Sequence, residues 1–505
     1  MISRAAHTIG EPGRERWILP YTGALIAGLA VVGFAAAASW IDWRWILIAL
    51  SAVAMLLPCG LLILRGRMDG FEPLTWFAIA FLILWVGRPA YDLSQQHFIY
   101  AERLITPTFT RMLVAGLLAG AGFAIGYLLP VGRSLASRIP RPSELEPRRL
   151  FVWAAIVLGI ALLAFCLFFI HAHGWRHPAS FFFRGRARLF QLSASPEATS
   201  KYFLASILLV VPAVLFFLAV RHSAGKDTRL GRVATGAALA SVAAFCAYNL
   251  GAGQRRYLIG MLLALALYWY LRRDRRPSLL SVAVVLVVAL TVLSAIRDLR
   301  LSHARHDSPN PALWLPWNAA THVFKTQDTG VAPSLALEML VVPSELHYTY
   351  GGTTIVGPIR TLIPRQIWTD KPLPADQQVL KTVFAGKPCT LGEQCDTFSP
   401  FGEPYRDGGL AAVFVFAVLF GLFWKVAWLY FSRNRDTVVA IVGYATLLPF
   451  MITWMRGNFT LPALQATMAL TVVVLAAIIC RPRDRDTGGA SPARDRGREA
   501  AGARG

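Results

Sequence analysis

The chain has 505 residues, of which 55% are apolar and only 15% are charged, and its formal net charge is +22. The apolar residues form blocks of about 18 to 25, long enough to cross roughly 30 Å of hydrocarbon. This composition excludes a soluble globular protein. The positive charge does not indicate nucleic-acid binding, because no recognition motif accompanies it and membrane topology alone places basic residues on one side of a bilayer.

We predict an all-α polytopic membrane protein with about twelve transmembrane helices. A tail, 1–17, precedes helices one to nine in 18–296, a large loop spans 297–406, helices ten to twelve occupy 407–480, and a basic tail, 481–505, is expected to be disordered. The first apolar block is too long for a signal peptide, so we interpret it as an anchor. The helices are predicted near residues 18–40, 45–64, 73–90, 109–131, 150–172, 202–221, 230–250, 255–271, 278–296, 407–431, 437–455 and 460–480.

Basic residues follow every second predicted helix, as Arg65 and Arg67 do after the second and Arg433 and Arg435 after the tenth. Lys and Arg resist translocation in short loops, so this side is interpreted as cytoplasmic. Both termini are then cytoplasmic in a protein of the inner (plasma) membrane, and the large loop lies on the outer face. Because that loop is rich in apolar and aromatic residues, we expect short helices at the membrane interface, packed against the bundle.

Two cysteines and a cluster of histidines are the candidates for a disulfide and for a metal site. Cys389 and Cys395 lie in the outer loop, where a disulfide between them is predicted, the alternative being two free thiols. His171, His173 and His177 cluster after helix five, but histidines at a helix end more often face headgroups, so neither a metal nor a cofactor is predicted.

Two groups of arginines stand on the predicted outer side. Arg176 and Arg184 follow helix five against the positive-inside trend; they would contact anionic headgroups or dock an anionic, lipid-linked substrate. Arg255 and Arg256 open helix eight after a short glycine-containing turn. Unfilled helix amides and two guanidinium groups suit phosphate there, although the arginines could instead reach the outer headgroups.

The outer loop carries two further motifs. One is Gly357-Pro-Ile-Arg-Thr-Leu-Ile-Pro-Arg-Gln-Ile-Trp-Thr-Asp-Lys-Pro372, and the other is Thr397-Phe-Ser-Pro-Phe-Gly-Glu-Pro-Tyr-Arg-Asp-Gly-Gly409, which leads into helix ten. Their order resembles the Wzy-type O-antigen and exopolysaccharide repeat-unit polymerases, and Gly253-Gln-Arg-Arg-Tyr-Leu-Ile resembles that family's short Gly/Arg turn. The motifs cover about a tenth of the chain, and Arg406-Asp407 departs from the Asn-Phe-like pair usual in the family.

The resemblance implies a membrane glycosyltransferase that polymerises polyprenyl-diphosphate-linked oligosaccharide repeat units at the outer face of the membrane. Its expected partners are the lipid-linked oligosaccharide, membrane lipids, a flippase and a chain-length regulator. Guanidinium groups that bind the leaving diphosphate would stabilise the transition state. The residues expected to do so are Arg255, Arg256, Arg360 and Arg365, with Lys371 as a further candidate.

The acceptor hydroxyl needs a base, for which Glu403 is the first candidate. Glu345 with His347 is the alternative base. Glu403 could instead cap a turn formed by Gly402, Gly408 and Gly409. The neighbours able to orient the sugar or take part in the chemistry are Tyr405, Arg406 and Asp407.

Three rival functions remain open. An O-antigen ligase shares the topology and outer loop, and a flippase or transporter of lipid-linked sugars suits twelve helices, although neither similar halves nor mid-membrane ionisable residues are evident. A glycosyltransferase that uses a polyprenyl monophosphate sugar would be expected to carry an acidic pair in the first outer loop, where only Asp42 stands.

Overall fold

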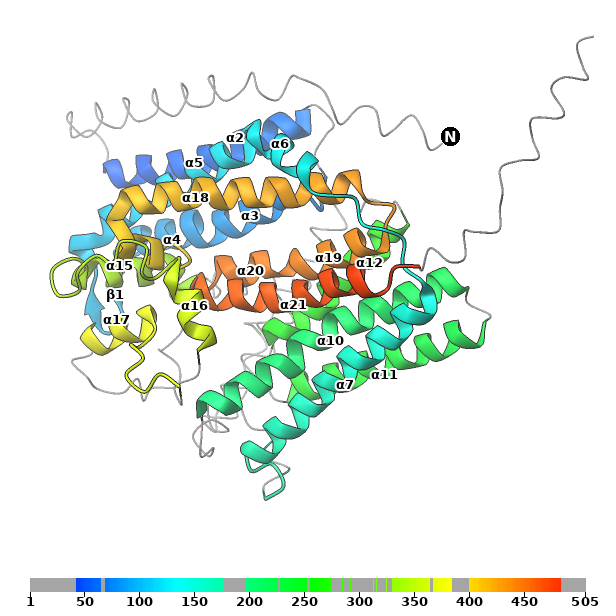
Figure 1. Cartoon of the computed structure of the whole chain (residues 1–505). Coiled ribbons are helices and arrows are strands. Elements are labelled where there is room, and N and C mark those ends of the chain that lie inside the picture. Colours follow the sequence, from blue (N-terminus) through cyan, green and yellow to red (C-terminus); the bar gives the residue numbers. More distant parts are fainter. Residues whose placement is uncertain are drawn as a thin grey trace, which may run out of the picture.

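The computed structural model describes residues 42–64, 69–176, 178, 181, 196–225, 228–251, 255–273, 284, 291, 312, 315, 324, 329–363, 367–383 and 399–482. Most of these residues are helical (Figure 1). The elements are α2 (Trp43–Leu64), α3 (Pro73–Phe81), the π-helix η3 (Leu82–Gly87), α4 (Arg88–Ser94), β1 (Ile99–Tyr100), β2 (Arg103–Leu104), α5 (Thr106–Leu128), α6 (Val131–Arg138), α7 (Pro147–His171), α10 (Pro196–Ala224), α11 (Arg229–Gly251), α12 (Arg255–Arg272), α15 (Val331–Val341), α16 (Val356–Leu362), α17 (Ala375–Val383), α18 (Gly402–Arg433), α19 (Val438–Leu447), α20 (Pro449–Met455) and α21 (Thr460–Ile479).

Within the described residues, 9 helical segments are long and apolar enough to cross a membrane. They coincide with predicted helices two to seven and ten to twelve, and the fold is that of an all-α multi-pass membrane protein, as predicted. Helix eight forms as α12, which carries Arg255, Arg256 and Arg272 at its ends. The first predicted helix, 18–40, lies outside the described residues, and so does nearly all of the ninth, 278–296.

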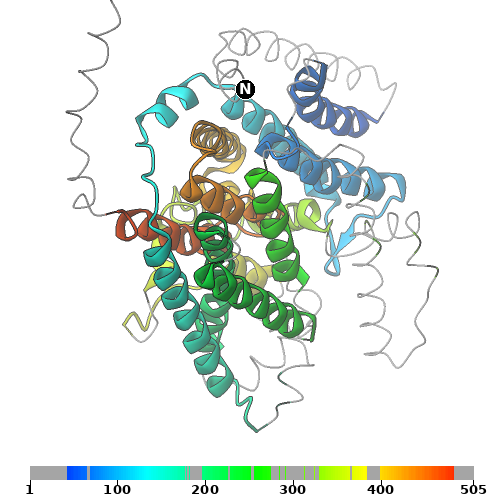
Figure 2. The same cartoon turned by 90° about the vertical axis from the view of Figure 1, so that its right-hand side faces the viewer.

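The helices form a layered bundle. In Figure 1, α2, α3, α5 and α18 lie on one side, α19, α20 and α21 in the middle, and α7, α10 and α11 on the other side. Figure 2, turned by 90°, likewise separates the blue helices near the N-terminus from the cyan and green α7, α10 and α11. Helix α10 packs against α7, α11 and α21 and so joins the last two groups.

Helices α5 and α18 pack along each other at unusually short range, because glycines stand where their backbones meet. A Cβ atom on Gly126 would lie 1.9 Å from the carbonyl oxygen of Val418, and one on Gly421 would lie 2.2 Å from the carbonyl oxygen of Phe123. Small residues permit this close approach, which is a common source of helix association in membranes. The contact fixes the position of α18 and therefore the positions of the residues at its ends.

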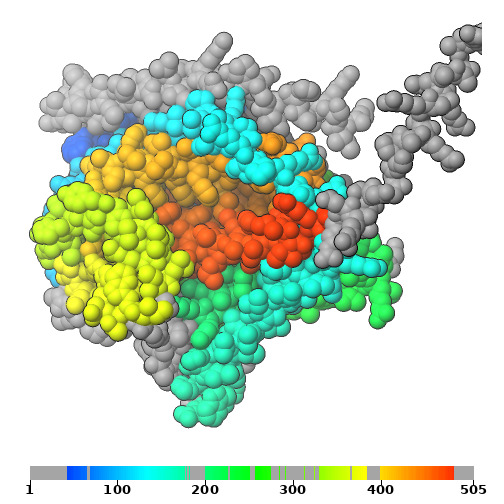
Figure 3. All heavy atoms as spheres, viewed as in Figure 1, coloured from blue at the N-terminus to red at the C-terminus, as the bar shows by residue number. Residues whose placement is uncertain are grey.

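Helices α15, α16 and α17 gather at one end of the bundle, on the left of Figure 1 and as the yellow block in Figure 3. Helix α15 is almost completely buried and packs against α4, α5 and η3 from the bundle and against α17. At the far end of α17, the Arg103 guanidinium in β2 donates to the Val383 carbonyl (2.6 Å). The described part of the segment predicted to be an outer loop thus packs against the helix bundle.

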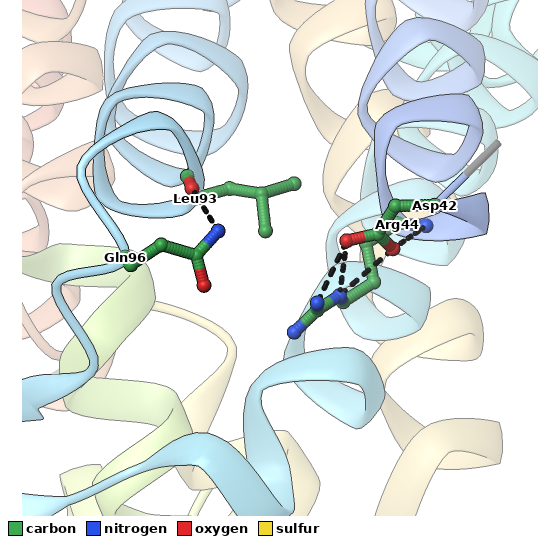
Figure 4. A network of polar contacts seen from close by, with 4 residues as sticks. All are labelled: Asp42, Arg44, Leu93 and Gln96. Carbon is green, nitrogen blue, oxygen red and sulfur yellow. Dashed lines mark hydrogen bonds and ion pairs between the residues drawn. The ribbon is translucent and has the colours of Figure 1, made fainter.

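The start of α2 is held by a local ion pair (Figure 4). The Arg44 amide donates to the Asp42 carboxylate (3.1 Å), and the Arg44 guanidinium binds both of its oxygens, at 2.7–3.0 Å. These hydrogen bonds lower the pKa of Asp42. In the same view, the Gln96 side chain donates to the Leu93 carbonyl at the end of α4 (2.9 Å).

Replacing Gly126 by Ala should force α5 and α18 apart. Overpacking of this kind destabilises a fold by about 1–3 kcal/mol, and we expect a lower melting temperature of the detergent-purified protein. The control is Gly159→Ala in α7, where no atom lies within 4 Å of the added Cβ; this change should leave the melting temperature unchanged or raise it. Equal melting temperatures for the two variants would show that the close contact does not stabilise the bundle.

Candidate functional site

The first turns of α18, from Gly402 to Asp407, are the centre of the candidate site. Glu403, Arg406 and Asp407 are all buried there, although charged side chains are rarely buried unless they are paired. Each of the three binds a different segment of the chain.

Glu403 connects α18 to the start of α21. Its Oε2 accepts hydrogen bonds from the backbone amide of Thr460 (2.9 Å) and from the Thr460 hydroxyl (2.7 Å). Thr460 is the first residue of α21, so the carboxylate satisfies a helix amide that has no intrahelical partner. The Glu403 carbonyl also accepts from the Thr353 hydroxyl (2.7 Å). Glu403 therefore caps a different helix, rather than the glycine turn of its own segment.

Asp407 connects α18 to residues 349–354 of the outer loop. Its Oδ1 accepts from the Thr349 hydroxyl (2.5 Å) and the Thr353 amide (2.9 Å), and its Oδ2 accepts from the Thr354 amide (2.9 Å) and the Thr354 hydroxyl. Both oxygens of the carboxylate are thus occupied. This geometry gives Asp407 the role of an anchor that positions the loop.

Arg406 connects α18 to α17. Its Nη1 donates to the Ala375 carbonyl (3.1 Å) and its Nη2 to the Gln378 side chain, while its buried Nε has no hydrogen-bond partner. Together with the bond from Arg103 to Val383, this clamps α17 at both ends. The guanidinium that was predicted to orient a sugar therefore holds α17 in this structure.

The helical path of α18 is interrupted directly after Asp407. Gly409 has φ +67° and ψ −150°, a conformation that only glycine adopts readily. A Cβ atom there would lie 3.0 Å from the Tyr348 hydroxyl oxygen. The Tyr348 and Tyr405 rings pack edge to face, and the Arg111 Nη1 lies 3.5 Å from the Tyr405 hydroxyl. The break thus separates the short charged segment from the long apolar part of α18.

Glu338 is a candidate functional residue that the sequence interpretation missed. It lies in α15 with 2% of its surface exposed, and its Oε2 has no hydrogen-bond partner. The carboxyl lies against Gly402, where a Cβ atom would be 2.2 Å from that oxygen. Burial raises the pKa of Glu338 to about 8; the charge of Arg406 lowers it, and those of Asp376 and Asp407 raise it. At neutral pH this carboxyl mostly holds its proton, and a perturbed buried acid is typical of functional sites.

Asp376 belongs to the same cluster. Its carboxylate receives the Gln377 amide (2.9 Å) and lies 3.5 Å from the Asn458 side-chain amide. Burial raises the pKa of Asp376, and the backbone hydrogen bond from Gln377 opposes that rise. The site therefore combines the buried Glu338 and the partly buried Asp376, both from the segment before α18, with the charged start of α18.

The other predicted acid–base residues are arranged differently. Glu345 and His347 are both exposed, in the segment that follows α15. Tyr405 is buried against Tyr348, next to the cluster. The structure thus brings Glu403, Tyr405, Arg406 and Asp407 together and leaves Glu345 and His347 at the surface.

The predicted diphosphate ligands are spread over separate elements. Arg256, in α12, is exposed and stacks on Tyr257, with its guanidinium 4.5 Å from the ring centroid. Arg360 is partly exposed in α16, and the Lys371 ammonium donates to the Ile363 carbonyl (2.9 Å). The Arg255 side chain and Arg365 lie outside the described residues.

Of the arginines after helix five, Arg176 is exposed, with its guanidinium 4.6 Å from the ring centroid of Trp175. Arg184 lies outside the described residues, and so do Cys389 and Cys395 with their predicted disulfide. In the part of the chain that the structure describes, no group of three or more His, Cys, Asp or Glu side chains is arranged to hold a metal ion.

The site thus belongs to a multi-pass membrane protein whose buried acids lie at one end of the helix bundle. Comparison with protein-family models, with curated proteins and with solved structures finds no match to the chain.

Replacing Asp407 by Ala should release residues 349–354 from α18. Each hydrogen bond to a charged group contributes about 1.5–3 kcal/mol, so hydrogen exchange at the Thr353 and Thr354 amides should accelerate by about tenfold or more. Asp436→Ala is the control, because Asp436 forms an exposed ion pair with Arg141 elsewhere. Unchanged exchange at Thr353 and Thr354 would contradict the anchoring role.

Replacing Glu338 by Gln should change how stability depends on pH. The folded state raises the pKa of Glu338 from 4.5 to about 8 and so binds a proton more tightly than the unfolded chain does. This group therefore makes the wild-type protein less stable as pH rises through that interval. In Glu338→Gln, the fall in melting temperature across the same interval should be smaller; parallel curves for the two proteins would refute the assignment.

Proposed function

We propose that the protein is a membrane glycosyltransferase that polymerises polyprenyl-diphosphate-linked oligosaccharide repeat units into O-antigen or exopolysaccharide. The proposal places it in the inner (plasma) membrane, with both termini cytoplasmic and the site at the outer face. The observation that carries it is the cluster of buried acids around Glu403, in the motif that resembles the polymerase family. Such a cluster supports proton transfer next to a membrane.

In the proposed reaction, the acceptor hydroxyl oxygen attacks the anomeric carbon of the donor glycan. The bond from that carbon to the diphosphate oxygen breaks, and the polyprenyl diphosphate leaves with the electron pair. The hydroxyl proton passes to a carboxylate base. Negative charge develops on the leaving diphosphate, where guanidinium groups such as those of Arg255, Arg256, Arg360 and Arg365 would stabilise it.

Glu403 remains the first candidate for the base. Thr460 binds one of its carboxylate oxygens, Oε2, and so fixes the orientation of the group, as a positioned base requires. Glu338 is a second candidate in its deprotonated form, because its pKa of about 8 lies near neutral pH, its Oε2 is unpartnered and it interacts electrostatically with Arg406. Asp407 and Arg406 then serve by holding the outer loop and α17 around these acids.

The alternatives differ in the acceptor or in the chemistry. An O-antigen ligase would use the same donor and a lipid A core acceptor, and a flippase would move the lipid-linked glycan without bond formation. A polyprenyl-monophosphate enzyme is disfavoured. It would be expected to carry an acidic pair in the first outer loop, where only Asp42 stands, and Asp42 is bound to Arg44 at the start of α2.

The test is incubation of the protein, reconstituted in lipid, with its organism's polyprenyl-diphosphate-linked repeat unit, followed by mass analysis of the products. We expect a ladder spaced by one repeat unit. Glu403→Gln should reduce elongation by about 100-fold or more, the scale of general base catalysis, because the amide can still accept from Thr460 but cannot take up the proton. Glu102→Gln, an exposed change in the hairpin, is the matched control.

If the wild-type protein leaves the repeat units unextended, the proposal of a polymerase is refuted. Transfer to added lipid A core would then identify a ligase, and movement of the intact lipid across the bilayer would identify a flippase. A normal ladder with Glu403→Gln would instead leave the polymerase standing and exclude Glu403 as its base.

A further inference from the structure

The turn from Thr349 to Gly352 has an unusual residue at its tip. The Gly352 amide donates to the Thr349 carbonyl (2.9 Å) and closes the turn, and the two central residues, Tyr350 and Gly351, have φ +47° and +90°. Two successive positive φ angles are normally supplied by Gly, Asn or Asp. A bulky aromatic residue in this conformation is uncommon and strained.

The turn is held in this conformation from both sides. The Thr349 and Tyr350 amides donate to the Arg406 and Asp407 carbonyls, each at 3.0 Å. The Asp407 carboxylate binds the Thr349 hydroxyl and the amides that follow the turn. Backbone strain persists only where the surrounding structure over-determines the conformation, which these bonds do.

The Tyr350 side chain contributes little to the packing that would justify this strain. It is 86% exposed, whereas Tyr348 packs against the buried Tyr405. Gly or Asn at this position would give the same turn without the strain. The ring is therefore displayed at the surface from a backbone that is held in place, on the loop that Asp407 ties to the candidate site.

We propose that Tyr350 is a stacking platform for a sugar ring of the glycan substrate. The flat face of a pyranose is lined by C–H groups, which pack on an aromatic face while the sugar hydroxyls remain in water. A ring carried on a rigid turn binds such a ligand with a smaller loss of conformational entropy than one carried on a mobile loop does. This inference rests on the proposed function, because it takes the glycan of the lipid-linked repeat unit as the ligand.

A membrane-surface anchor is the competing role for an exposed tyrosine. Ile355 and Ile359, which follow the turn, are 71% and 60% exposed, and aromatic residues favour the membrane interface. Interfacial anchoring, however, needs only a ring at the right depth and does not require a strained turn that hydrogen bonds hold to α18 from within the turn and from the residues after it. The rigid mounting therefore favours a ligand of defined shape.

The experiment measures binding of the lipid-free oligosaccharide, released by mild acid from the lipid-linked repeat unit, to the full-length protein in nanodiscs. Tyr350→Gly should weaken this binding by about tenfold or more and should raise the melting temperature, because the strain is relieved. Tyr350→Phe should bind within about twofold of wild type, since stacking needs the ring and not the hydroxyl. A purely structural role for Tyr350 would not give weaker binding together with higher stability.

Glycan binding by Tyr350→Gly equal to that of wild type would overturn the proposal, and a reduced retention of this variant on anionic vesicles would then assign Tyr350 to the membrane surface. Elongation is measured in parallel to separate the two proposals. If the wild type binds the glycan through Tyr350 but does not elongate it, the stacking role of Tyr350 stands and the proposed polymerase activity is refuted. Neither binding nor elongation by the wild type would remove both.

Discussion

Burial of three charged side chains within two turns of one helix is the constraint on which this end of the molecule depends. A buried charge without partners is costly, so Glu403, Arg406 and Asp407 must each be bound by other groups. Their partners come from α21, α17 and the outer loop respectively. The start of α18 therefore organises three segments that are distant in the sequence, and the close contact between α5 and α18 connects this arrangement to the bundle.

The glycine break after Asp407 explains how one helix serves two environments. On the N-terminal side of the break, the charged turn needs hydrogen-bond partners in several directions. On the C-terminal side, the long apolar part of α18 must form its backbone hydrogen bonds within the helix, as a membrane requires. Gly409 absorbs the change of direction, since its positive φ suits only glycine, and its missing side chain leaves room for the Tyr348 hydroxyl. The short segment can therefore tilt to meet the outer loop without distorting the membrane part.

Hydropathy predicted the nine long apolar helices of the described residues, because the length and continuity of apolar blocks are local properties of the sequence. It placed the start of α18 at residue 407 rather than Gly402, since Glu403, Arg406 and Asp407 resemble a solvent-exposed loop until their partners are known. Glu338 was missed for the opposite reason. It stands in an apolar run, and neither its complete burial nor its unpartnered oxygen can be inferred before α15 is packed against α5 and α17.

Departures from local preference are informative when the surrounding structure enforces them and packing does not explain them. Asp407 is an unusual buried acid, but its four hydrogen bonds account for its burial, so the residue is explained by the fold. The same bonds help to hold Tyr350 in a conformation that glycine would adopt with less strain, so this conformation does not make the fold more stable. Glu338 likewise keeps an oxygen without a partner in a buried position. Stability accounts for the burial of Asp407 but not for the conformation of Tyr350 or the unpartnered oxygen of Glu338, and both of these residues lie on segments that pack against the start of α18.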